Sequence, residues 1–504
     1  MKIIDDFLDK LTMYRLVLYY LILLLVVAFI FSVLKILSFN PLLLLFSTLF
    51  LVAVSWITNK VFAYTFNAPA NVESVYISAL ILALILTPAR SLQDGIFLFW
   101  AAVLTIASKY ILAIGKKHIF NPVAIAVALT AFAGVGSASW WVGTLPMLPF
   151  ELLGLLIVRK LRRYDLVFYF FLASFVSMFL FTILKGGDVL TTLREVVVAS
   201  SLFFLAFVML TEPLTTPPTK KLQGIYGAFV GVLFAPQFHI GTFYTTPEIA
   251  LVIGNVFSYL VSPKTKIIAP LLERKQISSD IVDFLFAPGK KFAFAPGQYM
   301  EWTLQHSKTD SRGNRRYFTI ASSPTEDKVL LGIRFYPKGS SFKKALLTLK
   351  PKSNIVGGQI SGDFTLPKNK NQKLVFIAGG IGITPFRSMI RYLIDTKEKR
   401  PIVMFYANKR ADEIAYADIF DKAQKELAIK TVYTLTEKSE VSSSWQGKVG
   451  RIDAAMIRQV VPDFSERVFY LSGPHSMVVS YEKVLRSMGI PEKHIKKDFF
   501  PGLA

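Results

Sequence analysis

Residues 374–385 read Leu-Val-Phe-Ile-Ala-Gly-Gly-Ile-Gly-Ile-Thr-Pro, an apolar run that passes directly into a glycine-rich turn. The run Leu374–Ala378 has the length and the branched and aromatic residues of an interior strand. Glycines allow a tight turn and a close approach of a dinucleotide to the backbone. We therefore expect a strand, a turn and a helix that bind a nucleotide, through Gly379, Gly380, Gly382, Thr384 and Pro385.

Three further apolar runs follow, at Ile402–Tyr406, Thr431–Leu435 and Val468–Ser472, and they alternate with helical stretches. This alternation predicts a parallel sheet with helices packed on it. The last run leads into Gly473 and Pro474, with Met477 close behind.

Upstream, from Thr265 to Lys373, the pattern changes to short alternating strands such as Ile281–Phe286 and Met300–Leu304. This pattern predicts a small antiparallel barrel. Two features stand out within it: the segment Arg316-Tyr317-Phe318-Thr319, and an expected helix Phe342–Leu349 that opens with Gly339-Ser340-Ser341. The free N–H groups at a helix start favour a phosphate group.

A barrel followed by a nucleotide-binding sheet resembles the ferredoxin–NAD(P) reductase family. The motifs occur in the family's order: Pro296-Gly297-Gln298-Tyr299, the Arg316–Thr319 segment, Gly339-Ser340-Ser341 and Gly362-Asp363-Phe364. The glycine turn ends in the family's Thr-Pro, and Ser472 stands where the family usually has Cys. The resemblance implies an enzyme that takes electrons from NAD(P)H and passes them through FAD.

The resemblance also implies roles for single residues. Arg316 would pair with the FAD diphosphate, and Tyr317 and Phe318 would supply the aromatic wall of the flavin ring. Thr319 would hydrogen-bond the flavin N5 edge, and Phe500 would cover the ring until nicotinamide displaces it. We expect Thr319 and Phe500 to act in catalysis. The remaining cofactor-binding residues are Gly339, Ser340, Ser341, Gly379, Gly380, Gly382, Thr384, Pro385, Gly473, Pro474 and Met477.

The choice between NADH and NADPH depends on few residues. Glu437, beside Lys438, would repel a 2′-phosphate and favours NADH slightly. Arg387, Arg391 and Arg410 would favour NADPH, but we interpret each of them as a solvated charge.

Composition excludes several other chemistries. The 504 residues contain no cysteine, which excludes disulfides, thiolate-held iron–sulfur clusters and a cysteine nucleophile. Five histidines leave little for a metal, and we expect no metal site. The net charge of +23 lies mainly after Thr265, and a domain tethered to anionic lipid explains it more simply than nucleic acid does.

The first half of the chain is apolar enough for a membrane domain, because a spanning helix needs about 20 apolar residues. We expect about ten spans, and we expect the first to be retained. Lys and Arg in the short loops favour a cytoplasmic N-terminus, and therefore a cytoplasmic reductase on the cell (inner) membrane. The expected spans are 15–37, 41–58, 73–87, 95–114, 121–135, 141–158, 166–184, 195–211, 223–236 and 246–262.

A faint internal repeat relates spans five apart. Ile85-Leu86-Thr87-Pro88 ends the third span, and Met209-Leu210-Thr211-Glu212-Pro213 ends the eighth. Asn121-Pro122 opens the fifth span, and Thr246-Pro247 opens the tenth. An odd offset reverses direction, so the pattern is typical of inverted repeats, although chance similarity between Leu-rich helices would also produce it.

Two segments resemble the membrane subunits of the NqrB/RnfD family: Phe207–Thr215, followed by Gly224–Ala228, and His118–Pro122. The resemblance implies a ten-helix inverted repeat that handles electrons and binds flavin. The threonine that carries covalent FMN in that family has only a poor match at Thr144. A second, non-covalent flavin or a quinone between the helices stays open.

The sequence therefore predicts three domains: a multi-pass α-helical membrane domain (1–262), an FAD-binding barrel (263–370) and an NAD(P)-binding α/β domain (371–504). Together they suggest a membrane-bound oxidoreductase whose acceptor is a quinone, a flavin or a redox protein. A ferric-reductase or NADPH-oxidase type is disfavoured, because haem needs paired histidines and only His118 and His239 precede residue 300.

Two further hypotheses concern the role of the apolar half. One is an ion pump, for which Lys109 is a candidate charge within the spans, although this lysine could equally snorkel or pair with a carbonyl. The second is a reductase that its helices merely anchor, for which ten spans are excessive.

Overall fold

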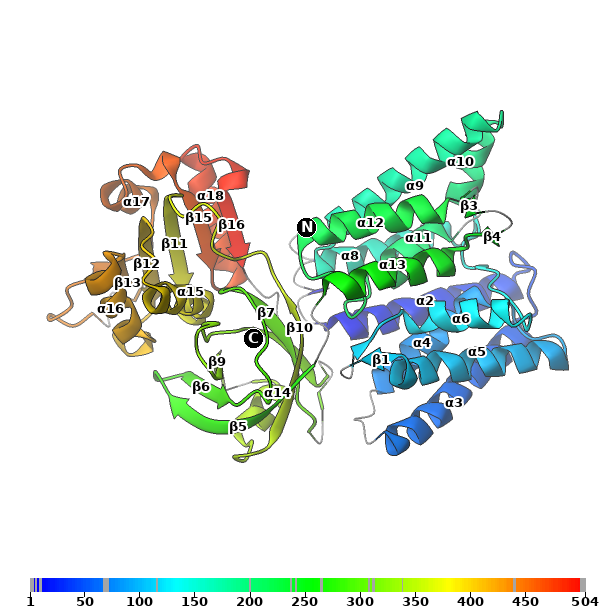
Figure 1. Ribbon diagram of the computed structural model, residues 1–504, viewed down its shortest axis with the longest axis horizontal. Coiled ribbons are helices and arrows are strands. Elements are labelled where there is room, and N and C mark those ends of the chain that lie inside the picture. Colours follow the sequence, from blue (N-terminus) through cyan, green and yellow to red (C-terminus); the bar gives the residue numbers. More distant parts are fainter. Residues whose placement is uncertain are drawn as a thin grey trace. The chain divides into compact units, whose positions relative to one another are not determined.

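The computed structural model of the chain divides into two compact units (Figure 1). The helical unit comprises residues 11–266, and the second unit comprises residues 267–504 together with 1–10. The structure describes residues 4, 7–8, 11–66, 72–114, 117–198, 201–235, 238–240, 243–262, 266–306, 309–310, 313–337, 339–437 and 441–498.

The second unit begins with a six-stranded antiparallel sheet in the order β8-β7-β10-β5-β6-β9, as the alternating pattern predicted. Its core is aromatic, with Trp302, Phe284 and Phe342 fully buried. The elements are β5 (Ile267–Gln276), β6 (Ile281–Phe286), β7 (Tyr299–Thr303), β8 (Arg315–Thr319), β9 (Val329–Arg334), the helix α14 (Ser341–Leu347) and β10 (Asn354–Ser361).

A parallel sheet follows, in the order β14-β13-β12-β11-β15-β16. The strands are β11 (Leu374–Gly379), β12 (Ile402–Asn408), β13 (Lys430–Leu435), β14 (Lys448–Val449), β15 (Val468–Ser472) and β16 (Ile495–Asp498). The helices are α15 (Thr384–Thr396), α16 (Ala417–Leu427), α17 (Ala454–Val460) and α18 (His475–Ser487). The expected order, an antiparallel sheet followed by a parallel sheet with helices, is confirmed.

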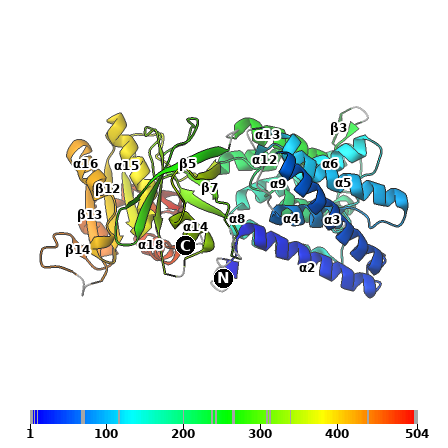
Figure 2. The ribbon, with the colours of Figure 1, turned by 90° about the horizontal axis from the view of Figure 1, so that it is seen from below.

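Helices cover both faces of the parallel sheet, which is why β11 is a continuous apolar run. Phe376 and Met404 pack with residues of α15 and α16 on one face. Ile377 and Phe405 pack with residues of α17 and α18 on the other. Figure 2 shows α15 and α16 beside β12 and β13.

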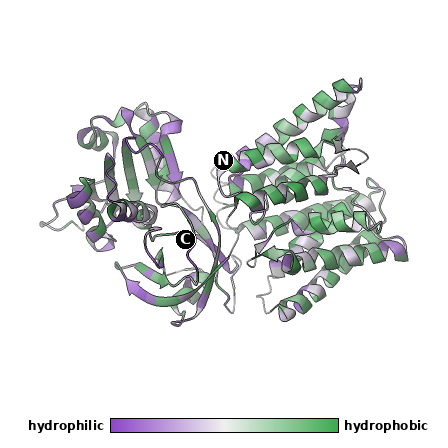
Figure 3. Ribbon diagram, in the orientation of Figure 1, coloured by the Kyte–Doolittle hydropathy of each residue, from purple (hydrophilic) through white to green (hydrophobic). Residues whose placement is uncertain are grey.

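In the helical unit, four helices of the described part are long and apolar enough to cross a membrane: α2 (Met13–Val33), α3 (Pro41–Thr65), α5 (Leu92–Ile111) and α9 (Tyr164–Leu184). A fifth span results if α10 (Val189–Val198) and the helix over Leu202–Met209, which meet at 59°, count as one. Figure 3 shows the apolar colouring of these helices.

The other helices of this unit are shorter than a span. They are α4 (Val72–Ile85), α6 (Pro122–Phe132), α7 (Leu148–Glu151), α8 (Leu155–Leu161), α12 (Lys220–Phe234) and α13 (Pro247–Val261), with α11 (Leu202–Phe204) leading into a π-helix, Leu205–Met209. The ten expected spans are therefore not confirmed as ten helices of spanning length.

Hydrogen bonds join the first and second expected halves of the helical unit at two places. Asn121, at the start of α6, donates through Nδ2 to Glu212 Oε2 at 2.9 Å, just beyond the π-helix. In the other half, Trp140 donates from its backbone N–H to Ile85 O at 3.0 Å, at the end of α4. The indole Nε1 of the same Trp140 donates to Glu248 Oε2 at 3.1 Å, at the start of α13. These hydrogen bonds link the two expected halves, and the inverted repeat stays a prediction.

Candidate functional site

The carboxyl ends of β11 and β15 lie side by side in the parallel sheet, and the strand order reverses between them. Such a switch point is where open α/β sheets bind nucleotides. The glycine turn follows β11, and Gly473 and Pro474 follow β15, so the topology brings both expected nucleotide segments together.

The main chain around this turn leaves no room for a side chain at Gly382, and at Gly379 the Met477 side chain would have to move. A Cβ atom on Gly382 would lie 2.4 Å from Ser472 O and 2.5 Å from Gly473 N. A Cβ atom on Gly379 would lie 2.1 Å from Met477 Sδ. The turn therefore packs closely against the end of β15, and Met477 packs against it from α18.

A cavity with about 920 Å³ of open space lies where the barrel faces this turn. Tyr317, Phe318 and Thr319 line it from β8, and Thr384 and Pro474 line it from the opposite side. The full lining is Tyr317, Phe318, Thr319, Gly332, Ile333, Arg334, Tyr336, Lys343, Gly379, Ile381, Gly382, Thr384, Ser472, Gly473, Pro474 and Asp498.

These residues fit the expected cofactors. Tyr317, Phe318 and Thr319 all line the cavity from β8, and they supply aromatic and hydroxyl groups of the kind that a flavin ring uses. The facing wall is glycine backbone, as a dinucleotide requires. An apolar lining with a few polar groups is typical of cofactor sites.

The carboxylate of Asp310 contacts the groups that we expected to hold the FAD diphosphate. Arg316 is 2% exposed and does not line the cavity; its Nη2 lies 3.7 Å from Asp310 Oδ1. The backbone N–H of Ser341 donates to Asp310 Oδ2 at 2.8 Å. Ser340 caps α14 by accepting from Lys343 N at 3.3 Å. A diphosphate at this place would take over the hydrogen bonds of Asp310.

Arg334 is a cavity residue that the motifs did not indicate. It extends from β9 to Gly380, a residue with a φ of +52°. A Cβ atom added to Gly380 would lie 2.6 Å from Arg334 Nη1. Its Nη2 donates to Glu413 at 2.8 Å, and its Nε lies 2.6 Å from Asp280. Burial opposes the charge, but these two carboxylates raise the pKa of Arg334 above its ordinary value. Only the packing of β9 against the glycine turn, a tertiary contact, could reveal it.

One further expectation concerns the chain beyond β16. Asp498, the last residue of β16, lines the cavity and is 8% exposed. Because β16 is parallel to β15, the chain leaves the sheet at the edge where the glycine turn lies. Phe500, expected to cover the flavin, lies outside the described residues, so its role stays a prediction.

The charges at the ends of β12 and β13 are paired. Lys409 Nζ lies 3.6 Å from Glu437 Oε1, and Arg410 Nε lies 3.3 Å from Asp412 Oδ1. Lys438 falls outside the described part of the chain. Arg391 pairs with Asp395 on its own helix at 3.0 Å, with 36% of its side chain exposed, as a solvated charge should.

The interpretation of Arg387 as a solvated charge is wrong. Arg387 is 8% exposed, and its Nη1 donates to Ala321 O of the barrel at 3.0 Å. It also forms a bidentate ion pair with Glu326. Helical periodicity placed this arginine near a solvated face, but packing of the barrel against α15 covers it.

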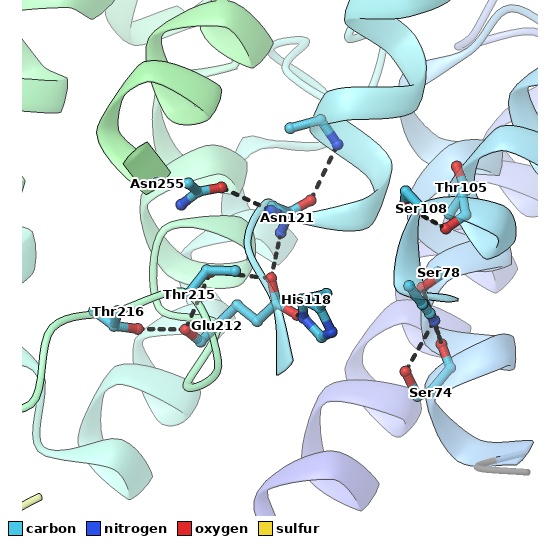
Figure 4. Close-up of polar contacts among 12 residues, drawn as sticks. Ser74, Ser78, Thr105, Ser108, His118, Asn121, Glu212, Thr215, Thr216 and Asn255 are labelled. Atoms are coloured by element: carbon cyan, nitrogen blue, oxygen red, sulfur yellow. Dashed lines mark hydrogen bonds and ion pairs between the residues drawn. The ribbon is translucent and has the colours of Figure 1, made fainter. Parts of the chain in front are cut away.

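A second candidate site lies in the helical unit, where a cavity with about 550 Å³ of open space is mostly apolar. Glu212 lies at one pole (Figure 4) and accepts hydrogen bonds from Asn121 Nδ2 at 2.9 Å and Thr215 Oγ1 at 3.1 Å. His118 Nε2 lies 3.3 Å from the same carboxylate. Thr211 and Pro213 complete this end of the lining.

Ser74 and Ser78 of α4 form the other pole of this cavity. Lys109 donates to Ser74 O, Ser74 Oγ and Ser78 Oγ, each at 2.9 Å. Of the roles considered for Lys109, pairing with a carbonyl is thus the one observed. Thr144, the poor match to an FMN-bearing threonine, is part of neither cavity lining.

Comparison with known proteins agrees with the geometry of the second unit. Residues 376–483 match the family model described as the oxidoreductase NAD-binding domain. Among curated relatives, a flavohemoprotein of Burkholderia sp. (strain TH2) is 27% identical over 227 residues, 44% of this chain and 56% of its own. A glycine betaine monooxygenase reductase subunit of Chromohalobacter salexigens is 25% identical, over 42% of this chain and 56% of its own.

A nitrate reductase [NADPH] of Emericella nidulans is 29% identical over 52% of this chain and 33% of its own. This chain therefore spans about half the length, or less, of the curated relatives it matches. Among solved structures, the cytochrome P450 reductase GcoB of Amycolatopsis superposes with a TM-score of 0.42 at 24% identity, covering 47% of this chain and 69% of that one. The fold assignment rests on the two sheet topologies and not on this superposition.

The matches confirm the expected class of the second unit: a reductase module that depends on FAD and takes electrons from NAD(P)H. They give no counterpart for an NqrB/RnfD-like membrane domain and no indication of the final acceptor. The activity of the whole chain is therefore a matter of proposal.

Proposed function

We propose that the protein is a membrane-bound NAD(P)H oxidoreductase that passes electrons through FAD to an acceptor held by the helical unit. The observation that carries this is the cavity in which Thr319 of the barrel faces Thr384 and Gly382 of the nucleotide turn. FAD, when bound, supplies the conversion of a hydride into single electrons. Thr319 and its neighbours on β8 would hold the flavin on one side of this cavity, and the glycine turn would hold the nicotinamide on the other.

We expect nicotinamide to bind over the glycine turn, because at Gly379 and Gly382 no side chain separates the backbone from the cavity. Thr319 is 7% exposed and offers its hydroxyl next to the ring that Tyr317 and Phe318 enclose. Arg334 offers positive charge beside Gly380 for the phosphates of the dinucleotide. We propose NADH as the preferred donor, because Glu437 occupies the carboxyl end of β13 and Lys409 is already paired with it.

The long apolar helices support attachment to a membrane. Leu42, Leu49 and Ile57 on α3 are 70%, 59% and 56% exposed, and Phe168 on α9 is 60% exposed. Exposed apolar surface of this extent favours lipid as the surroundings. We propose a multi-pass protein of the inner membrane with the reductase module in the cytoplasm, where NAD(P)H is available.

The cavity between Glu212 and the Ser74–Ser78 pole supports an acceptor inside the helical unit. Its lining is apolar except for hydrogen-bonding groups at its two poles, which suits a planar ring with polar atoms at both ends. A non-covalent flavin or a quinone headgroup meets this description. The alternative to a flavin or quinone in this cavity is a redox protein that docks on the outside of the helical unit.

Cofactor extraction from the purified protein tests the proposal. We expect FAD in a 1:1 ratio, bleaching of its absorbance by NADH, and reduction of ferricyanide at the expense of NADH. A second flavin in the extract would identify the acceptor in the membrane unit. A Soret band would replace the proposal with haem-based transfer, and a colourless protein that NAD(P)H does not affect would disprove it.

A further inference from the structure

Two consecutive residues of α15 hold the barrel at two adjacent carbonyl groups. Arg387 Nη1 donates to Ala321 O at 3.0 Å, and Ser388 Oγ donates to Ser322 O at 2.6 Å. Ala321 and Ser322 belong to the segment that leaves β8 directly after Thr319. The helix therefore fixes this segment in both position and direction.

Glu326 completes the arrangement. Its carboxylate binds both Nη atoms of Arg387, with Nη2 to Oε1 at 3.0 Å, and accepts the backbone N–H of Ser323 at 2.6 Å. The Arg387 side chain is only 10% exposed, and its guanidinium lies 5.8 Å from the ring centre of Tyr416. A buried bidentate pair of this kind is geometrically rigid. We call these residues, Arg387, Ser388, Ala321, Ser322 and Glu326, the α15 clamp.

The clamp lies next to both sides of the cofactor cavity. Ala321 is two residues after Thr319, and Arg387 is three residues after Thr384. Thr319 and Thr384 both line the cavity. The hydrogen bond from Arg387 to Ala321 therefore closes a short link between the strand that meets the flavin and the turn that meets nicotinamide.

We propose that Arg387 is a positioning residue for hydride transfer: through the α15 clamp it sets the distance between the flavin strand and the nicotinamide turn. This inference rests on the proposed function, because it assigns Arg387 a part in that reaction. A displacement of about 1 Å between reacting groups lowers a rate about 100-fold. Lysine cannot replace arginine here, because it lacks the planar fork that bonds carbonyl and carboxylate together.

The full-length protein in detergent or nanodiscs provides the first test, with Arg387→Lys and Glu326→Gln as variants. Arg391→Lys is the matched control, since Arg391 is on the same helix and pairs with Asp395, whose hydrogen bond from Thr325 of the barrel the variant leaves in place. Stopped-flow absorbance would give the rate of flavin reduction at saturating NADH, its dependence on NADH concentration, and the isotope effect with NADH deuterated at C4.

For both clamp variants we expect hydride transfer to be at least tenfold slower than in the wild type, with a changed isotope effect and a weaker nicotinamide–flavin charge-transfer band. The NADH dissociation constant should stay within about twofold of the wild-type value. Arg391→Lys should match the wild type in every measurement. Rates and isotope effects of the clamp variants within twofold of the wild type would overturn the proposal. A wild type that NAD(P)H does not reduce would instead refute the proposed function.

A distance measurement tests the same clamp without cofactor chemistry. The chain has no cysteine, so Glu273→Cys on β5 and Lys422→Cys on α16 give two unique sites for spin labels, both on exposed residues. We expect one narrow distance distribution in the wild-type background and in Arg391→Lys. Arg387→Lys should broaden or shift it, and an unchanged distribution would count against the clamp even if that variant loses FAD.

Discussion

At Gly382 the backbone of the nucleotide turn passes so close to β15 that a methyl group has no place. The clash would be with main-chain atoms of Ser472 and Gly473, which cannot rotate away as a side chain could. Other contacts at the cofactor site also depend on single chemical groups. Asp310 occupies hydrogen bonds expected for a phosphate, and Arg387 ties a helix to a strand.

Gly382→Ala should therefore slow flavin reduction by NADH at least 100-fold while FAD stays bound, because the turn must move before nicotinamide can bind. Stopped-flow reduction together with FAD content measures both effects. Gly289→Ala is the control, since a Cβ atom there meets no atom within 4 Å. Equal rates in Gly382→Ala and the wild type would show that the turn does not contact the dinucleotide.

Asp310→Asn should strengthen FAD binding about three- to tenfold, the range that the loss of one partly exposed ion pair allows. The reason is that the Asp310 carboxylate now engages Arg316 and the Ser341 N–H. Titration of the FAD-free full-length protein with FAD, followed by flavin fluorescence, gives the dissociation constant. Weaker binding would mean that Asp310 orients Arg316 for the cofactor instead of competing with it.

At the scale of elements, β6 and the segment before α16 are joined by a buried hydrogen bond. Tyr416 Oη donates to Asp283 Oδ1 at 2.5 Å. Burial raises the pKa of Asp283 to about 6, against the smaller opposing effects of Tyr416 and Arg387. Lys275 also faces this carboxyl group and lowers its pKa, whereas Glu326 raises it.

A carboxyl whose folded-state pKa is raised stabilises the fold when protonated. We therefore expect the reductase unit to lose up to about 3 kcal/mol as the pH rises from about 4 through about 6. Asp283→Asn should remove this part of the pH dependence, because an amide does not ionise. Chemical denaturation of wild type and variant between pH 4 and pH 8 measures the difference, and parallel curves would contradict the assignment.

The helical cavity allows a prediction at the same scale. Ile81→Trp on α4 should fill the space between Glu212 and the serine pole and lower NADH-dependent reduction of a water-soluble quinone at least tenfold. Ferricyanide reduction should be unaffected, because it draws electrons from the reductase module. Leu42→Trp, on an exposed helix position, is the control. An undiminished quinone rate in Ile81→Trp would place the acceptor elsewhere.

At the scale of the whole molecule, the chain combines a catalytic unit of soluble type with helices whose exposed surface is apolar. We expect the protein to sediment with membranes, to resist extraction by carbonate at pH 11 and to require detergent for release. In sealed inverted vesicles, added NADH should bleach the flavin without permeabilisation. A signal that appears only after permeabilisation would place the reductase module on the opposite side.

The motifs predicted the reductase unit closely because each of them depends on local chemistry. The expected strand Ile281–Phe286 is β6, and the expected helix Phe342–Leu349 is α14 with ends shifted by at most two residues. The side chains of a half-buried strand alternate between the two faces of the sheet, which gives a period of two residues in the sequence. A run of glycines marks a tight turn, because glycine adopts backbone angles that other residues rarely adopt. The helical unit was less predictable, because an apolar run predicts burial in protein and in lipid equally well. Short helices such as α6 and α13 therefore could not be distinguished from full spans.

The sequence by itself determined the order of the elements, the nucleotide turn and the class of cofactor, since these follow from neighbouring residues. Only the tertiary structure decided that Arg387 clamps the barrel, that Arg334 reaches Gly380, and that Glu212 meets Asn121. These contacts join residues roughly fifty to ninety positions apart. Their geometry is set by how whole elements pack, and no local pattern encodes that packing.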